Sequence, residues 1–241
     1  MTPPRVLVVT PTYNERDNLP GLVRAVLAND GYRVLVVDDA SPDGTGALAD
    51  ELAGEFIGRV DVLHRTGPRG LGRSYVDGLQ HALKGPADLI CQMDGDWSHD
   101  PSYLPSLVEA AATHDVVIGS RYLNGVSVVN WPLQRIILST FANRYVRAVT
   151  HLSPKDCTSG YRCWRREALA KLPLERVVSD GYAFLVEMLF EAARRGARIG
   201  EVPIIFVERR KGVSKLSTGI MFESLLIPWR LQFRSWSKPT P

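Results

Sequence analysis

Two carboxylates stand at the end of an apolar run. Asp94, Gly95 and Asp96 follow residues 87–93, whose composition is that of a buried strand. Side chains alternate along a strand, so residues two apart point the same way, and both carboxylates can converge where the chain turns. Paired carboxylates repel each other unless a cation lies between them, and a hard divalent ion that also holds a phosphate meets that need. The pair is therefore either a metal site or an acidic surface turn.

The elements that must position this pair follow a regular alternation. Short apolar runs rich in β-branched residues predict strands over residues 6–10, 34–38, 60–64, 89–94 and 116–119. Amphipathic stretches between them predict helices over residues 17–29, 43–56, 71–84 and 101–114. This order predicts an α/β fold with a mostly parallel central sheet flanked by helices. Ligands of such sheets bind at the carboxyl ends of the strands, where both aspartates fall.

The alternation breaks after Arg121. We expect a helix over residues 131–150, a glycine-containing segment over 155–162, a helix near 182–195 and a strand over 199–208. A basic loop, residues 209–215, leads to a final helix over about 218–236. The chain thus reads as one domain, residues 1–217, with a C-terminal helical extension, residues 218–241.

The turn after the first predicted strand carries Pro11, Tyr13, Asn14 and Glu15. A dinucleotide-binding dehydrogenase would place a GxGxxG motif there, so its absence weighs against an NAD enzyme. An aromatic ring, an amide and a carboxylate instead suit stacking on a nucleobase or hydrogen bonding to its edge. The alternative is that Asn14 or Asp17 merely caps the next helix.

A further carboxylate, Asp39, follows the second predicted strand. A carboxylate in this position commonly holds a ribose hydroxyl, and we expect this role for Asp39, whereas Asp43 suits a turn or helix cap. Because Asp39 and Glu15 are expected on the same edge, a metal site is the favoured interpretation of Asp94 and Asp96. Mg²⁺ typically takes one or two carboxylates and completes its shell with phosphate oxygens and water.

Basic residues of the second half suit an anionic substrate. Arg135 and Ser139 are four residues apart and share a helix face, and with Arg121 they would form a fork for a phosphate. Arg209 and Lys215 add two cations in the glycine-containing loop. The alternative is a solvated basic face.

The overall composition excludes some classes of protein. The chain has 241 residues, of which 45% are hydrophobic, and a net charge of +3, which is too small to indicate nucleic acid binding. Its three cysteines lack zinc-like spacing, which favours a reducing cytosol. We see no signal-peptide pattern and expect no transmembrane helix, so membrane contact would be peripheral.

The last predicted helix suits an interface with lipid or with a membrane-embedded partner. Its large apolar residues follow spacings of three and four and form one stripe, flanked by basic residues. The alternative is that the stripe packs on the protein's own core, and Pro228 is expected to kink or split the helix. The stripe consists of Phe222, Leu225, Leu226, Trp229, Phe233 and Trp236.

Taken together, these motifs resemble glycosyltransferase family 2, which has the GT-A fold, and within it the dolichol- or polyprenol-phosphate mannose synthases. The resemblance runs from Arg5 to about Ser217. Its ordered motifs are Pro-Thr-Tyr-Asn-Glu from Pro11, Val-Asp-Asp-x-Ser-x-Asp from Val37, Asp-Gly-Asp-x-x-His from Asp94, Gly-Ser-Arg-Tyr from Gly119, Asn-Trp-Pro-x-x-Arg from Asn130, Thr-Ser-Gly-Tyr-Arg from Thr158 and Arg-x-x-Gly-x-Ser-Lys from Arg209.

The resemblance implies a role for each matching residue. The nucleoside of GDP-mannose would be held by Pro11, Tyr13, Glu15, Val37 and Asp39. The donor diphosphate would lie at Asp94, Gly95 and Asp96, with Mg²⁺ or Mn²⁺ as cofactor and with Arg209 and Lys215 closing over it. The acceptor phosphate would be seated by Arg121, Arg135 and Ser139. Ser98 stands where family members commonly have glutamine as a third metal contact, so a contact of Ser98 with the metal would run through water.

The resemblance also implies the reaction. Mannose would pass from GDP-mannose to a polyprenyl phosphate with inversion, at the cytosolic face of a membrane, with Asp96 and Arg121 as the catalytic residues. Two alternatives remain open at this stage. One is transfer of glucose or another sugar to the same lipid, and the other is a non-catalytic subunit that binds a nucleotide sugar.

Overall fold

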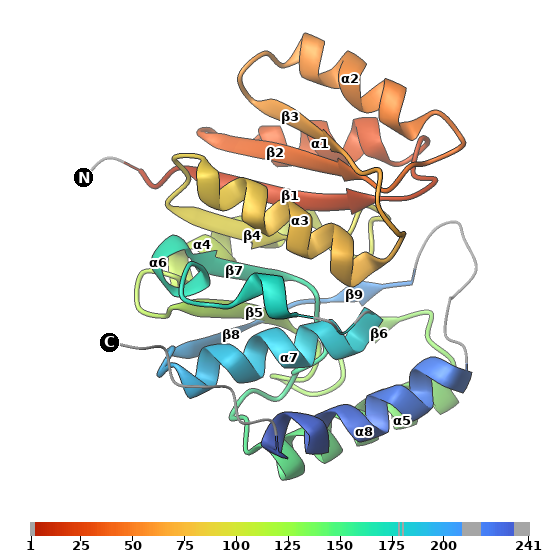
Figure 1. The fold of residues 1–241 in the computed structure, drawn as a ribbon, viewed down its shortest axis with the longest axis vertical. Helices are drawn as coiled ribbons and strands as arrows, with labels where there is room; N and C mark the ends of the chain where they lie inside the picture. Colours follow the sequence, from red (N-terminus) through yellow and green to blue (C-terminus); the bar gives the residue numbers. More distant parts are fainter. Residues whose placement is uncertain (1–2, 178, 180, 209–217, 234–241) are drawn as a thin grey trace.

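In this computed structural model, which describes residues 3–177, 179, 181–208 and 218–233, a seven-stranded sheet crosses the molecule (Figure 1). Its strand order is β3-β2-β1-β4-β7-β5-β8, and β6 and β9 form a separate parallel pair. The strands are β1 (Val6–Thr12), β2 (Tyr32–Asp38), β3 (Val60–His64), β4 (Leu89–Gln92), β5 (Val116–Ser120), β6 (Val128–Val129), β7 (Arg162–Arg165), β8 (Ile199–Pro203) and β9 (Phe206–Val207).

Helices cover both faces of the sheet. One face packs on α1 (Leu19–Leu27), α2 (Thr45–Glu55) and α4 (Leu104–Ala110). The other packs on α3 (Leu71–Lys84) and α7 (Gly181–Arg194), with α5 (Leu133–Thr150) and α8 (Thr218–Phe233) alongside α7 (Figure 1). A short helix, α6 (Arg166–Leu169), and two 3₁₀ turns, η1 (Pro101–Tyr103) and η2 (Leu174–Arg176), complete the described elements. The predicted mostly parallel sheet flanked by helices is thereby confirmed.

The first half of the chain folds as its pattern predicts. All seven residues of β1 are buried, as a central strand with helices on both faces requires. Helix α3 lies close to this strand because Gly78 has no side chain: a Cβ there would come within 2.6 Å of Val9 Cγ1 and 2.8 Å of Val37 Cγ2. The four predicted helices of this half start or end up to four residues inside the expected bounds, and η1 replaces the first turn of the fourth.

Strand β7 was not predicted from the sequence. The segment 155–162 was expected only as a glycine-containing connection, yet residues 162–165 form a strand antiparallel to both β4 and β5. Four residues with two arginines give no strand signal, and burial on both faces in the sheet overrides their weak propensity. The single strand expected over residues 199–208 was also wrong, because it is split into β8 and β9.

Helix α8 is continuous through Pro228, so of the two expected effects of this proline, a kink or a split, the split does not occur. Ile227 and Leu231 pack into the core, whereas Leu226, Trp229 and Phe233 are 61%, 49% and 78% exposed. The described part of the predicted stripe therefore faces outward and does not pack on the protein's own core. The side chains of Phe222 and Leu225, and Trp236 as a whole, lie outside the described residues.

Helix α5 adds a second outward apolar face. Leu133, Ile137 and Phe141 are spaced by four residues and are 70%, 60% and 60% exposed. The two helices lie side by side (Figure 1), and Gln232 Nε2 of α8 donates to the carbonyl of Val149 in α5 at 2.7 Å. Within the described residues, no helix combines the length and the apolar character needed to cross a membrane.

Candidate functional site

The predicted polar edge forms at the carboxyl ends of β1, β2, β4 and β5. Three turns along it hold non-glycine residues in the left-handed region: Asn14 with φ 62°, Ala40 with φ 54° and Trp97 with φ 64°. Such backbone costs about 1–3 kcal/mol per residue and gathers at functional sites. The strained backbone of the turns after β1, β2 and β4 therefore indicates that these turns belong to a functional site.

Asp94 is held by one residue of helix α3 and one residue of its own loop. Tyr75 Oη of α3 donates to Asp94 Oδ1 at 2.6 Å, and the Asp94 backbone N–H donates to His99 Nδ1 at 3.0 Å. Burial, together with the charge of Asp94, raises the pKa of Tyr75 well above its usual value, so its hydroxyl remains a donor. His99 is buried and stacked on Tyr161 with ring centroids 4.8 Å apart, which agrees with a structural role for this histidine.

Asp96 is more deeply buried than Asp94. It is 4% exposed, and its Oδ1 accepts the backbone N–H of Ser98 at 3.0 Å. Between the two carboxylates, a Cβ at Gly95 would lie 3.3 Å from the Pro11 carbonyl, so glycine allows the turn to close against β1. Ser98, which follows Trp97 and precedes His99, is itself buried.

This pair suits a hard divalent cation. Carboxylate oxygens are the preferred ligands of Mg²⁺ and Mn²⁺, and this turn carries two carboxylates spaced two residues apart. Among the described residues, no group of three or more histidine, cysteine or acidic side chains forms a complete metal site. Phosphate oxygens and water would therefore have to supply the remaining ligands.

Tyr13 and Glu15 lie on the same edge, in the turn after β1. The Arg69 guanidinium lies 5.0 Å from the Tyr13 ring centroid and also bonds to the Tyr13 hydroxyl. Glu15 accepts a hydrogen bond from Asn18 Nδ2 at 2.6 Å, and its backbone N–H donates to Thr45 Oγ1 at 3.0 Å. Arg69 is exposed and was not predicted as part of the site, because the loop before α3 carries no specific motif.

Asp39 already has two partners. Its Oδ1 is paired with the buried Arg65 side chain, and its Oδ2 accepts the Gly70 backbone N–H at 2.9 Å. Arg65 also bonds Asp77 Oδ2 at 2.6 Å, so Asp39 anchors the loop that leads into α3. The ribose contact expected of Asp39 would have to use lone pairs that these bonds leave over.

Pro11 and Val37 are strand residues of this edge. Both are buried, and the Val37 side chain packs against α3. A donor contact of Val37 would therefore come from its backbone. Pro11 pairs in register with Val37, beyond the point where β4 leaves β1, so its missing N–H breaks no bond of the described sheet.

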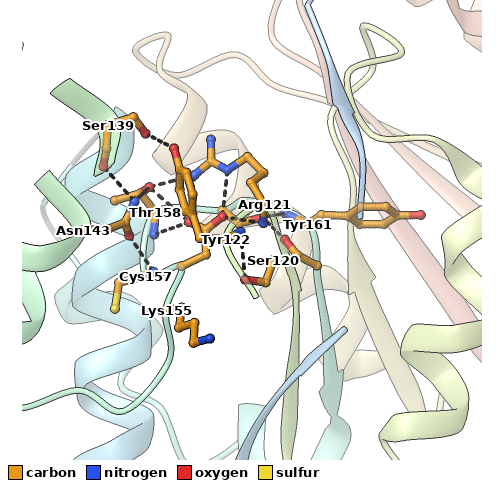
Figure 2. A network of polar contacts seen from close by, with 12 residues as sticks. Ser120, Arg121, Tyr122, Ser139, Asn143, Lys155, Cys157, Thr158 and Tyr161 are labelled. Atoms are coloured by element: carbon orange, nitrogen blue, oxygen red, sulfur yellow. Dashed lines mark hydrogen bonds and ion pairs between the residues drawn. The ribbon is translucent and has the colours of Figure 1, made fainter. Parts of the chain in front are cut away.

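Arg121 forms a buried ion pair that the sequence did not predict (Figure 2). Its Nε and Nη2 contact Asp156 Oδ2 and Oδ1 at 2.7 and 2.8 Å, and Nη2 also reaches Thr158 Oγ1 at 2.8 Å. The guanidinium lies 5.5–5.6 Å from the ring centroids of Tyr122, Trp131 and Phe206. The predicted fork arginine is thus oriented by a carboxylate and enclosed by aromatic rings.

The pKa of Asp156 reflects this pairing. Burial alone would raise it, but the charge of Arg121 and the hydrogen bonds from Arg121 and Thr158 outweigh burial and lower it below its usual value. The pair is therefore ionised at neutral pH.

Ser139 is connected to the same network (Figure 2). Tyr122 Oη donates to Ser139 Oγ at 2.7 Å, and Asn143 Nδ2 bridges the Ser139 carbonyl and Thr158 Oγ1 at 3.1 Å each. The structure thus joins two of the three predicted phosphate contacts through side chains of α5 and of the segment before β7. The Thr158 motif was the only sequence signal for that segment, and nothing marked Asp156 or Asn143.

Arg135 lies nearby but is also paired. Its Nη1 bonds to Glu208, and its guanidinium lies 4.0 Å from the Trp131 ring centroid. Arg121 and Arg135 both lie over Trp131, so the structure brings the two predicted arginines together. Arg209 and Lys215 lie outside the described residues.

A cavity of about 230 Å³ lies away from this edge, between β7, α6 and the end of α7. It is lined by charged residues, including Arg165, Lys171 and Arg195. None of the predicted site residues lines it. The carboxyl edge of the sheet, which carries the carboxylates and the arginines, is therefore the better candidate for the functional site.

A mostly parallel sheet with a carboxylate pair at its carboxyl edge is the arrangement expected of a nucleotide-sugar transferase, and the family comparison agrees. The family described as "Glycosyl transferase family 2" matches residues 7–172, and the chain belongs to this family. It is 47% identical over 223 residues to a polyprenol monophosphomannose synthase of Mycolicibacterium smegmatis, covering 92% of this chain and 84% of the relative. It is 48% identical over 226 residues to an undecaprenyl-phosphate mannosyltransferase of Micrococcus luteus, covering 92% of this chain and 91% of the relative.

Solved structures show the same fold. A glucosyl-3-phosphoglycerate synthase of Mycobacterium tuberculosis, in complex with Mn²⁺, UDP-glucose and phosphoglyceric acid, superposes with a TM-score of 0.68 at 18% identity. The match covers 93% of this chain and 79% of that one. At this identity the likeness concerns the fold alone, which is of the GT-A type.

Proposed function

We propose that this protein transfers mannose from GDP-mannose to a polyprenyl phosphate, with inversion at the anomeric carbon. The observation that carries the proposal is identity of 47–48% over 92% of the chain with two relatives named for polyprenyl-phosphate mannose synthesis. The geometry supports it, because one edge of the sheet presents a carboxylate pair from β4 and an arginine pair beside β5 and α5.

Asp94 and Asp96 would hold Mg²⁺ or Mn²⁺, and Tyr13, Glu15 and Asp39 would contact the nucleoside. When bound, the metal supplies positive charge that stabilises the departing diphosphate. Arg209 and Lys215, by resemblance, would add charge over the same group.

Arg121, Arg135 and Ser139 would orient the acceptor phosphate. A phosphate monoester has a second pKa of about 6, so it is largely dianionic at neutral pH and needs no general base. The chain's task is then to place one anion against the sugar of another. Pairing with Asp156 keeps Arg121 oriented. Arg135 is paired with Glu208, and the acceptor phosphate would take the place of Glu208 in this pair.

The apolar faces of α5 and α8 would rest on the membrane surface that carries the lipid acceptor, on its cytosolic side. Among the described residues, seven large apolar side chains are exposed on these two helices, and Arg144 and Arg230 are exposed on the same helices. This combination of an apolar face with flanking cations is typical of interfacial helices. The seven side chains are Leu133, Ile137, Leu138, Phe141, Leu226, Trp229 and Phe233.

Replacing Trp229 and Phe233 together with glutamine is expected to lower binding to lipid vesicles at least about tenfold, because each aromatic side chain contributes about 1.5–3 kcal/mol when buried in an apolar phase. The measurement is flotation with vesicles of phosphatidylcholine and phosphatidylglycerol. Ile57→Gln serves as the matched control, since Ile57 is 84% exposed but follows α2 at the far end of the molecule (Figure 1). Equal flotation of all three proteins would reject direct lipid contact and leave a membrane-embedded partner as the occupant of this surface.

The function itself is tested by incubating the protein with a short polyprenyl phosphate, Mg²⁺ and a panel of GDP-mannose, GDP-glucose, UDP-glucose and UDP-galactose. Formation of polyprenyl-phosphate mannose from GDP-mannose alone is the expected result. Transfer from UDP-glucose instead would overturn the donor assignment, and no transfer from any donor would overturn the catalytic role.

A further inference from the structure

Helix α3 contacts both carboxylates that frame the proposed donor site. At its start, the Gly70 backbone N–H donates to Asp39 Oδ2 at 2.9 Å. One turn later, Tyr75 Oη donates to Asp94 Oδ1 at 2.6 Å. The first turns of one rigid element therefore connect the expected nucleoside contact with the expected metal contact.

Tyr75 is well suited to fix a neighbouring group. Its side chain is 1% exposed, and its ring is stacked on Phe184 of α7 with centroids 5.9 Å apart and planes 6° apart. Burial and this stacking leave the hydroxyl little freedom to move. Asp94, in contrast, is part-exposed and stands in a turn, where a side chain without such a partner would sample several rotamers.

The hydrogen bond also distinguishes the two oxygens of Asp94. Oδ1 accepts from Tyr75, and a Cβ at Gly160 would lie 3.8 Å from it, so this oxygen is enclosed by α3 and the segment before β7. Oδ2 lies 3.9 Å from His99 Nδ1, which already accepts the Asp94 N–H. Oδ2 is therefore the oxygen that remains for a cation.

We infer that Tyr75 is a positioning residue of the metal site, which holds Asp94 so that one oxygen binds the divalent cation. The inference rests on the proposed function for the identity of the site. Groups that orient metal ligands typically contribute about 10–100-fold to metal affinity or activity. A purely structural role, in which Asp94 merely satisfies a buried tyrosine hydroxyl, would affect stability and leave metal affinity unchanged.

The test is Mn²⁺ binding by Tyr75→Phe, measured by electron paramagnetic resonance in the presence of GDP. This variant keeps the ring and its stacking on Phe184 and removes only the hydroxyl. We expect an increase of about tenfold in the Mn²⁺ dissociation constant, with GDP affinity in EDTA unchanged. Tyr32→Phe is the control, because Tyr32 is a buried tyrosine at the opposite end of β2.

A second measurement separates positioning from damage to the fold. In an Asp94→Asn background, the Tyr75→Phe change should weaken Mn²⁺ binding no further, since the two residues act through one contact. Equal Mn²⁺ affinity of the wild type and Tyr75→Phe would overturn the inference, as would equal losses in Tyr75→Phe and Tyr32→Phe. The binding assay needs no acceptor or turnover, so a protein that transfers no mannose yet loses Mn²⁺ affinity in Tyr75→Phe would refute the proposed function and retain the role of Tyr75.

Discussion

Asp96→Asn is expected to lower kcat for mannosyl transfer at least about 10³-fold, because removing one charged ligand forfeits several kcal/mol of transition-state stabilisation at the diphosphate. Asparagine keeps the shape of the side chain and an oxygen that can accept the Ser98 N–H, so the turn after β4 should persist. The measurement is single-turnover transfer at saturating GDP-mannose, with Mg²⁺ and Mn²⁺ tested separately.

The control for this variant lies four residues further along. Asp100 is exposed and caps η1 by accepting the Ser102 N–H at 2.9 Å. Asp100→Asn makes the same chemical change outside the proposed metal site, so its kcat should stay within about twofold of wild type, as for most surface substitutions. Full turnover by Asp96→Asn with either metal would show that this carboxylate is not a ligand.

Breaking the Arg121–Asp156 pair is expected to have a large effect on stability as well as on activity. Arg121→Met leaves a buried carboxylate without its partner, which typically costs about 3–5 kcal/mol. The double variant Arg121→Met/Asp156→Asn removes both charges and should regain most of that loss, while transfer stays at least about 10²-fold below wild type because the phosphate contact is gone. The measurements are denaturant unfolding and transfer rate for the two single variants and the double variant.

Two outcomes would contradict this account. Transfer restored in the double variant would mean that Arg121 acts only on the fold, and additive stability losses would mean that the two charges are not coupled. Acid unfolding gives an independent check. The folded-state pKa of Asp156 is lowered, so its stabilisation is complete above the unfolded value of about 3.9 and disappears as the pH falls through the folded value. Asp156→Asn should lack this acid-dependent loss.

The placement of the proposed donor residues on one edge of the sheet was predicted from the sequence. The strands before residue 95 are nearly continuous apolar runs, and the parallel order places their carboxyl ends together, so Tyr13, Asp39, Asp94 and Asp96 could be assigned to one edge from the sequence alone. The side-chain partners of these residues could not be predicted in the same way. Arg65, which binds Asp39, lies 26 residues away in a loop without a motif, and such pairing depends on how the chain returns in space.

The surroundings of the proposed acceptor residues were predicted less completely, for a physical reason. Arg121 and Arg135 were expected to form a fork for a phosphate, and each has a carboxylate partner that is distant in sequence: Asp156, 35 residues on, and Glu208, 73 residues on. The sequence shows that a cationic residue is present, but it does not show which carboxylate pairs with it. Asp156 reaches Arg121 only because β7 enters the sheet antiparallel, and a strand of four residues with two arginines lacks the apolar pattern that would have revealed it.

The place of β7 in the sheet also determines the order in which the two halves of the site can be completed. Strands β3, β2, β1 and β4 are neighbours and are all made within the first 92 residues, so these four strands, which carry the proposed nucleotide site, can pair in a nascent chain. Strand β5 has no partner in that group, because β7 lies between it and β4, and β7 ends only at Arg165. During synthesis, therefore, the four strands that carry the proposed nucleotide site can pair with one another before β5, which leads to Arg121, has a partner in the sheet.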